Sequence, residues 1–197
     1  MTAELPRLNR DVAPDRRAPV RIVHLGLGAF HRSHQAWYTQ HAGDAGGEWG
    51  GIASFTGRRP DAAEVLAAQD GLFTVVERSD SGDTFEVVGS IIEAVDGANV
   101  DRLVELVAAP PQTAVVTLTI TEAAYGFAAD DVTLLRAGEK PTTPLGRLVL
   151  GLAARRDSDA GSLAVVSCDN LSDNGNVARR AVVDLARGSR RRAGGLD

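Results

Sequence analysis

Short, mainly apolar runs alternate with helix-like stretches along most of this 197-residue chain. Segments 73–78 and 84–92 alternate apolar and polar residues around Gly82, which predicts a hairpin. Strands that alternate with helices predict an α/β fold, here a doubly wound, mostly parallel sheet with an antiparallel hairpin excursion. The other predicted strands span 21–25, 50–56, 114–120 and 163–167, and the strands at 114–120 and 163–167 are expected to be buried. The predicted helices span 33–41, 61–68, 100–108, 144–155 and 176–186. Ser33 and Asp61 are the predicted N-caps of the helices at 33–41 and 61–68.

The first predicted strand breaks at Gly26-Leu27-Gly28 and leads into a helix. Glycines at such a turn let the main chain approach a pyrophosphate, and the free N–H groups of the helix point at it. His31 replaces the third glycine of the usual dinucleotide fingerprint, so the pattern alone leaves open a tight structural turn without a ligand.

Four segments, in order, resemble the mannitol dehydrogenase family of polyol-specific long-chain dehydrogenases and fructuronate and tagaturonate reductases. They read GLGAFHRSHQ at 26–35, AAQDGLFT at 67–74, TLTITEAAY at 117–125 and SCDNLSDNGN at 167–176, within a resemblance that extends over 21–186. The resemblance implies a Rossmann-like domain. It also implies an NAD(P)-dependent oxidoreductase that interconverts a polyol or sugar-acid secondary alcohol and its ketone.

Polar residues follow four of the predicted strands, and the carboxyl ends of parallel strands meet at one edge of a sheet. We expect Arg32 to neutralise phosphate charge, Phe30 to cover the turn, and His31 to pack and hydrogen-bond around it. Glu122 and Tyr125 fit cofactor contact and structural support equally well. The full set of expected cofactor-binding residues is Gly26, Leu27, Gly28, Ala29, Phe30, His31, Arg32, Arg58, Arg59, Glu122 and Asp169.

Asn170 is the candidate catalytic residue. By resemblance, the asparagine of the Ser-Cys-Asp-Asn segment donates a hydrogen bond to the oxygen that cycles between alcohol and carbonyl, which stabilises developing alkoxide charge. The alternative is a turn in which Asn170 bonds to the main chain. Asp169 is expected to orient this loop.

The choice between NAD and NADP rests on the end of the second strand. An NAD-specific domain carries Asp or Glu there, to bind the ribose 2′-hydroxyl. This chain has Arg58 and Arg59, which suit a 2′-phosphate or a solvated loop, and Asp61 follows a few residues late. The resemblance favours NAD, with NADP as the alternative.

Composition and charge bear on which partners, metals and cellular compartments to expect. A net charge of −5 and a pI near 5.4 argue against nucleic-acid and membrane partners. The single Cys168 excludes an internal disulfide and a cysteine-based zinc site, and His31 and His34 have no partner ligand at metal-binding spacing, so we expect no metal. With no apolar span or signal segment in the sequence, we expect a cytoplasmic protein.

We expect an N-terminal arm at 1–20, an incomplete dinucleotide-binding domain at 21–186 and a disordered basic tail at 187–197. The resemblance implies a catalytic lysine in a Lys-x-x-x-x-Asn-x-x-His stretch of a helical C-terminal domain. Lys140, the only lysine, lacks that context, so both base and domain are expected to be absent. The chain would then be an inactive fragment that supplies the cofactor-binding part. The alternatives are a non-catalytic nucleotide-binding or regulatory protein and a degraded gene product.

Overall fold

The computed structural model describes residues 8–11, 18–42, 50–109 and 113–190. Its main sheet has five parallel strands in the order β5-β2-β1-β6-β7. Taken in chain order within this sheet, that arrangement is 3-2-1-4-5, the order of a doubly wound dinucleotide-binding domain. The predicted fold class is therefore confirmed. The strands are β1 (Val20–Leu25), β2 (Gly51–Phe55), β5 (Ile91–Val95), β6 (Val115–Leu118) and β7 (Ala164–Ser167).

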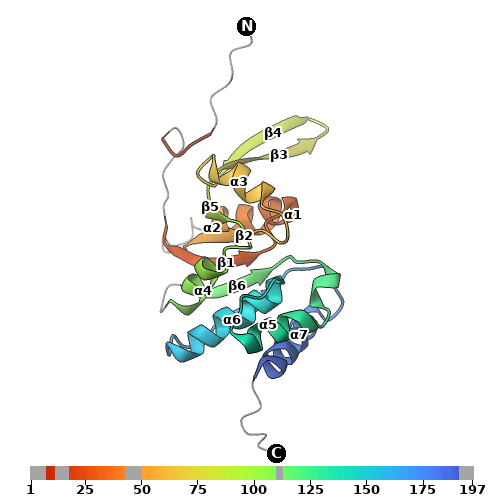
Figure 1. Ribbon diagram of the computed structural model, residues 1–197. Helices are drawn as coiled ribbons and strands as arrows, with labels where there is room; N and C mark the ends of the chain where they lie inside the picture. The colour runs from red at the N-terminus through yellow and green to blue at the C-terminus, as the bar shows by residue number, and fades with distance from the viewer. Residues whose placement is uncertain (1–7, 12–17, 43–49, 110–112, 191–197) are drawn as a thin grey trace, which may run out of the picture.

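Helices cover both faces of this sheet (Figure 1). One face packs against α4 (Val100–Ala108), α6 (Pro144–Asp157) and α7 (Asn174–Ser189), and the other against a helical segment at 29–42 and α3 (Asp61–Ala67). Side chains along a strand point alternately to the two faces of the sheet. Phe55 of β2 is therefore buried on the face of α4, α6 and α7, and Ile52 on the face of α3 and the segment 29–42. This double burial explains why the central strands are apolar without alternation.

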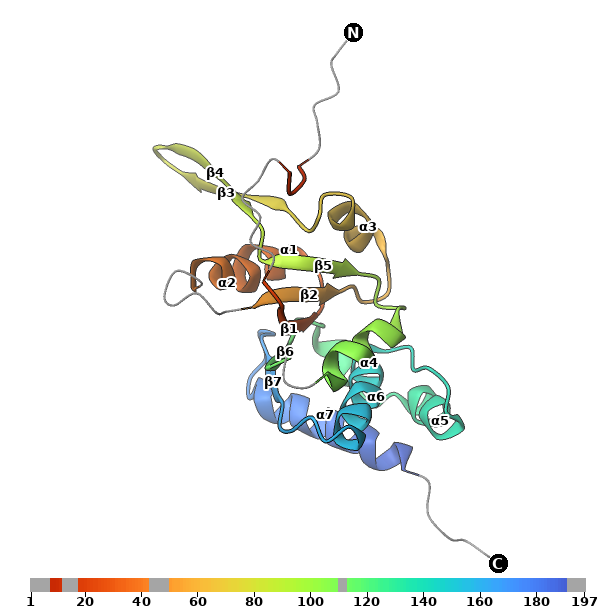
Figure 2. The same cartoon turned by 90° about the vertical axis from the view of Figure 1, so that its left-hand side faces the viewer.

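The second strand of the hairpin, predicted at 84–92, ends earlier than predicted, at Val88. β3 (Phe73–Ser79) pairs antiparallel with β4 (Gly82–Val88), but β5 begins after a break and joins the main sheet beside β2. Val88 and Ile91 are both fully buried, and because strand side chains alternate, residues three apart in one strand cannot face the same side. The hairpin itself projects from the body in both Figure 1 and Figure 2.

Both predicted helix caps are also wrong. The first helix begins at α1 (Ala29–His31) with Gly28 as N-cap, and it continues through a π-helical turn η1 (Arg32–Ala36) into α2 (Trp37–Ala42). Ser33 lies inside it, where its hydroxyl donates to the Ala29 carbonyl 3.1 Å away, a bond that replaces capping. In α3 the N-cap is Pro60, and Asp61 occupies the first turn.

Three further differences concern the C-terminal half. The sequence did not predict the 3₁₀ turn η3 (Glu122–Tyr125) or α5 (Ala129–Ala137). Strand β7 lies at the sheet edge and is partly exposed, with Val166 44% exposed, because it has a strand neighbour on one side only. Helix α7 reaches Ser189, so the predicted tail is helical at 187–189, and Arg190 is the C-cap of this helix. The rest of the predicted tail, from 191, lies outside the described residues.

Of the expected N-terminal arm, 1–7 and 12–17 lie outside the described residues, and Val20 belongs to β1. Arg10 is buried, and its guanidinium donates to the carbonyls of Gly89 and Ile91 at 2.9 Å each. This short segment is therefore attached where β4 passes into β5. No helix in the described part of the chain is long and apolar enough to cross a membrane.

Candidate functional site

The carboxyl ends of β1 and β6 form the switch point of the sheet. The strand that follows β1 in the chain lies on one side of this pair, and the strand that follows β6 lies on the other (Figure 2). Ligands of doubly wound folds bind in the crevice outside the strand ends at this point. The predicted site segments 26–32, 119–122 and 168–170 all follow directly on β1, β6 and β7.

The glycine turn is fixed from both neighbouring strands. The N–H groups of Gly26 and Leu27 both donate to the Phe55 carbonyl at 2.9 Å, and the Thr119 hydroxyl donates to the Gly26 carbonyl at 2.9 Å. Gly26 has φ +116°, and a Cβ there would lie 2.0 Å from the Thr119 carbonyl oxygen. Only glycine fits this close approach.

Gly28 is the open position of the turn. The nearest atom to a Cβ built there is the Gly26 carbonyl oxygen, at an ordinary 3.6 Å. The helix starts at the next residue, and the first N–H groups of a helix have no partner within it. The turn therefore presents main-chain donors and positive helix-end potential beside unfilled space, which is the arrangement that binds a pyrophosphate.

Two buried histidines support this turn from the sheet side. His24 on β1 and His31 on α1 are both 0% exposed, and their rings stack in parallel with centroids 3.4 Å apart. His24 bonds through Nδ1 to the Thr117 hydroxyl at 2.7 Å and through Nε2 to the Thr119 hydroxyl at 2.9 Å. His31 bonds through Nε2 to the Ser54 hydroxyl at 2.9 Å. Together these contacts attach the start of the helix to β1, β2 and β6.

Burial keeps both imidazoles uncharged. It lowers the pKa of His24 well below its ordinary value, and the neighbouring His31 lowers it further. It also lowers the pKa of His31 to about 4, against a weaker opposing effect of the hydrogen bond to the Gln35 side-chain oxygen. Sequence reasoning missed His24, although a histidine inside an apolar strand was the available signal.

The other predicted residues of the turn divide by exposure. Leu27 is buried in the core, so like His31 it offers a cofactor only its main chain. Phe30 is 52% exposed and stacks on His34, with ring centroids 4.1 Å apart. Ala29 is exposed and Arg32 is half-buried, which leaves both in reach of solvent at the turn.

Asp169 joins the loops that follow β6 and β7. Its carboxylate accepts from the main-chain N–H groups of Ile120 at 3.1 Å and Thr121 at 3.3 Å, and from the Tyr125 hydroxyl at 2.6 Å. Thr121 has φ +72° and ψ 153°, a strained conformation for a β-branched residue that these bonds help to hold. Burial and the Asp169 carboxylate raise the pKa of Tyr125. Both residues therefore act as supports of the loop.

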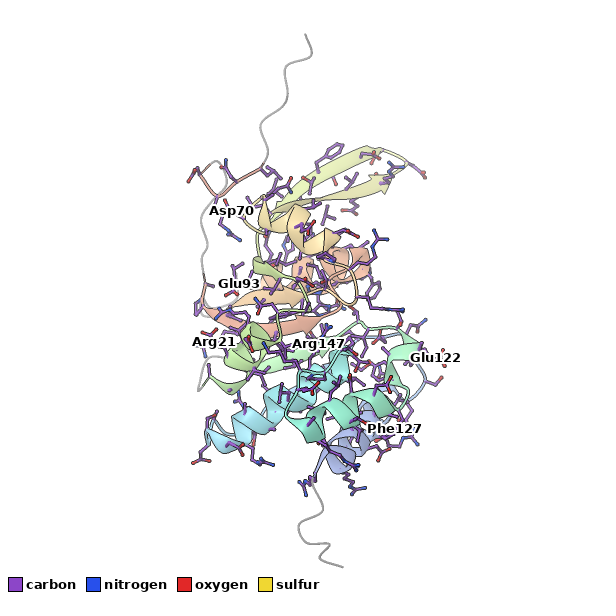
Figure 3. The ribbon with its side chains drawn as sticks, viewed as in Figure 1. Arg21, Asp70, Glu93, Glu122, Phe127 and Arg147 are labelled. Atoms are coloured by element: carbon purple, nitrogen blue, oxygen red, sulfur yellow. The ribbon has the colours of Figure 1, made fainter. Side chains whose placement is uncertain are left out.

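Asn170 is exposed at this edge, directly after Asp169. Within the part of the chain that the structure describes, it makes no side-chain bond to the main chain; Asn174 makes such bonds instead, to the carbonyls of Ser167 at 3.2 Å and Asp169 at 3.0 Å. The Asn170 carboxamide is thus left available in a loop held on both sides. Glu122 is also exposed, at the outer side of the same edge (Figure 3).

The end of β2 carries the two predicted arginines. Arg58 and Arg59 are both exposed, and Nε of Arg59 lies 2.6 Å from a carboxylate oxygen of Asp61. Asp61, the late acidic residue of this loop, is therefore paired with Arg59. Among the described residues, no group of three or more His, Cys, Asp or Glu side chains is placed to hold a metal ion.

The geometry agrees with the comparisons with known proteins. The protein-family model described as the mannitol dehydrogenase Rossmann domain matches residues 20–193 of this chain. The chain is 37% identical to D-mannonate oxidoreductase of Escherichia coli K12, over 86% of this chain and 38% of that protein. It is 37% identical to mannitol 2-dehydrogenase of Cereibacter sphaeroides, over 84% of this chain and 37% of that protein.

A solved structure of Pseudomonas fluorescens mannitol 2-dehydrogenase, a ternary complex with NAD and D-mannitol, superposes with a TM-score of 0.80 and 29% identity. The match covers 93% of this chain and 43% of that one. The chain thus spans about two fifths of the length of these proteins. By sequence and by fold, it belongs to the mannitol dehydrogenase family, and the part it matches is that family's Rossmann domain.

Proposed function

We propose that the chain binds a nicotinamide dinucleotide, NAD in the first place, as the cofactor-binding part of a polyol or sugar-acid dehydrogenase. The observation that carries this proposal is the turn at 26–28, where Gly26 packs against Thr119 and Gly28 stays open before a helix start. The relative solved with NAD and D-mannitol supports the same cofactor and a polyol substrate.

Each exposed group at the edge has a place in this proposal. The N–H groups of Gly28 and Ala29 would hold the pyrophosphate, and the Arg32 guanidinium would offset its charge. The bound dinucleotide supplies hydride exchange with the carbinol carbon of the substrate. Asn170 would donate its carboxamide N–H to the substrate oxygen, and Asp169 keeps that loop in position through Thr121 and Tyr125.

The proton of the alcohol needs a base, and the family resemblance assigns that role to a lysine. Lys140, the only lysine, is paired with Asp101 of α4 at 2.6 Å. The catalytic lysine implied by the family resemblance is not among these 197 residues. The proposal is therefore cofactor binding by this chain, with turnover requiring a base that is supplied from elsewhere.

The test is Gly28→Asp, measured as the dissociation constant of NADH by calorimetry. The new side chain enters open space, so the fold should persist, but it brings a carboxylate to the pyrophosphate position. We expect affinity to fall by about tenfold or more, the effect of losing one charge-assisted contact. Ser162→Asp, at the opposite, amino edge of the sheet, is the control and should bind like the unchanged chain. Equal affinity in both variants would refute the assignment.

The alternative is a nucleotide-binding or regulatory protein without catalysis. The coding DNA that follows Asp197, read in all three frames, separates the two. A continuation with the lysine segment supports a dehydrogenase, whereas a stop followed by an unrelated gene supports the alternative.

A further inference from the structure

A buried arginine reaches the end of β2 from the opposite helix layer. Arg147, in the first turns of α6, is 8% exposed, and its Nη1 donates to the Gly57 carbonyl at 3.3 Å. Figure 3 shows it in the interior, in contrast to Glu122 at the outer edge.

In the part of the chain that the structure describes, Arg147 is not neutralised by direct contact with a carboxylate. Among the described residues its Nε has no hydrogen-bond partner. Asp131 is occupied by bonds from Thr142 and Thr143, and Asp96 accepts from Thr56 and Ala98. Burial lowers the pKa of Arg147, and these two carboxylates oppose that shift only from a distance. A buried positive charge thus lies directly beneath the loop of Arg58 and Arg59.

The loops after β2 and β5 are packed tightly around this guanidinium. A Cβ on Gly97 would lie 2.0 Å from the Thr56 carbonyl oxygen and 2.6 Å from Nη1 of Arg147. The Gly97 N–H donates to the Thr56 hydroxyl at 2.9 Å. Because the inner side of the loop is filled in this way, the Gly57 carbonyl has a fixed, inward direction.

The opposite side of the same peptide is open. In a trans peptide the N–H points away from the carbonyl, so the Arg58 N–H is directed outward when the Gly57 carbonyl faces Arg147. Within the described chain neither Gly57 nor Arg58 donates its main-chain N–H to a protein acceptor. A Cβ on Gly57 would meet nothing within 4 Å. The outer surface therefore combines free donors, space and the exposed side chains of Arg58 and Arg59.

We propose that Arg147 is a positioning residue that lets the end of β2 accept the 2′-phosphate of NADP(H) as well as the 2′-hydroxyl of NAD(H). It does so by holding the Gly57–Arg58 peptide with its N–H outward and by placing positive charge beneath it. This inference rests on the proposed nucleotide binding and adds the class of nucleotide that the site takes. The absence of a free carboxylate in this loop, since Asp61 pairs with Arg59, agrees with it.

The test compares the dissociation constants of NADP⁺ and NAD⁺ for the 197-residue chain and its variants by calorimetry. Arg147→Met removes the charge and the bond at nearly equal length. We expect it to weaken NADP⁺ binding about tenfold more than NAD⁺ binding, the effect of one hydrogen bond to a charged group. Arg147→Lys keeps the charge, so its ratio of the two dissociation constants should lie between those of the original chain and Arg147→Met. Replacing both Arg58 and Arg59 by Ala should move the ratio in the same direction.

Arg155→Met is the matched control. Arg155 is equally buried, at 6% exposed, on the same helix, but its guanidinium bonds to the carbonyls of Val107 and Gly161 at the amino edge of the sheet. Its loss should lower the unfolding temperature and leave the ratio of the two dissociation constants unchanged. Gly57→Ala is a second probe, because its methyl group enters open space and should weaken NADP⁺ binding without unfolding the chain.

The outcomes separate cleanly. An unchanged ratio in Arg147→Met or, if that variant does not fold, unchanged NADP⁺ affinity in Gly57→Ala would overturn the inference. Binding of NAD⁺ alone by the original chain would overturn it while leaving the proposed function intact. Binding of neither nucleotide would refute the proposed function and this inference together.

Discussion

At the residue scale, the site depends on two polar side chains, His24 and His31, that are fully buried beneath the glycine turn. His24 and His31 use four hydroxyl or amide partners, which come from β2, from β6 and the residue after it, and from the helix itself. Buried polar networks of this kind are stabilising when every member is satisfied and costly when one is not. Their value here is that they give the glycine turn one position relative to the helix start.

This network predicts acid sensitivity. With a pKa of about 4 in the folded chain and 6.5 when unfolded, His31 takes up a proton first in the unfolded state as the pH falls. Its contribution to stability is therefore complete above pH 6.5 and declines toward pH 4, by about 3 kcal/mol over the whole window. Urea unfolding at pH 7, 6, 5 and 4 measures this.

Two variants isolate the share of His31. His31→Gln should make stability fall less steeply with pH across this window, because one of the two buried imidazoles is gone while His24 remains. His34→Gln, at an exposed position three residues on, should keep the original slope. An identical slope in all three proteins would assign the acid sensitivity to other groups.

At the scale of elements, one carboxylate of the projecting hairpin binds three side chains of the helical segment 29–42. Glu86 on β4 accepts from Nε1 of Trp37 at 2.8 Å and Nε2 of Gln40 at 2.9 Å, and lies 3.0 Å from Nε2 of His41. Although burial acts in the opposite direction, these bonds lower the pKa of Glu86. Gln40 also donates to the Val87 carbonyl at 3.2 Å, so Glu86 supplies a large part of the polar attachment but not all of it.

Removing this carboxylate should loosen the hairpin alone. In Glu86→Ala we expect amide hydrogen exchange within 73–88 to increase several-fold, since local opening no longer breaks bonds to a charged group. Exchange in α6 should stay unchanged. Glu77→Ala, an exposed position on the partner strand, is the control and should behave as the original chain. If Glu86→Ala exchanged its hairpin amides no faster than Glu77→Ala, the bonds from α2 to Glu86 would not be what holds the hairpin.

The elements also show which features a sequence can predict. Apart from η3, α5 and the division between β4 and β5, the order of strands and helices followed from patterning, because apolar runs reflect burial in any packing. Helix starts did not follow, since Ser33 resembles a cap locally yet bonds back to Ala29 once Gly28 begins the helix. The break after β4 was equally hidden, because it depends on which face of the sheet buries Val88 and Ile91.

At the scale of the whole molecule, the switch point brings the predicted segments to one edge but gives them unequal roles. Family resemblance identified Asp169 and Asn170, and the structure separates them into a support with three donors and an exposed carboxamide. Arg147 could not be found in this way. It is about 90 positions from Gly57 in the sequence, and only the packing of α6 beneath the loop brings it there.

The lysine that the family resemblance implies as the catalytic base is not among these 197 residues, and this leads to a prediction about dehydrogenase turnover. Hydride transfer from a secondary alcohol needs a base for the hydroxyl proton, and such groups contribute about 10²–10⁴-fold to the rate. These 197 residues retain Asn170 but place their one lysine in a pair with Asp101. Substrate positioning by further residues would be missing too, which adds to the deficit.

We therefore expect no measurable oxidation of mannitol or reduction of fructose or fructuronate by residues 1–197 with either nicotinamide cofactor. NADH binding by the same preparation shows that the chain is folded. The decisive control is Gly28→Asp, because a contaminating dehydrogenase would be indifferent to it, whereas activity of this chain depends on the turn. Turnover above a buffer blank that this substitution abolishes would mean that a group already in the chain takes the proton.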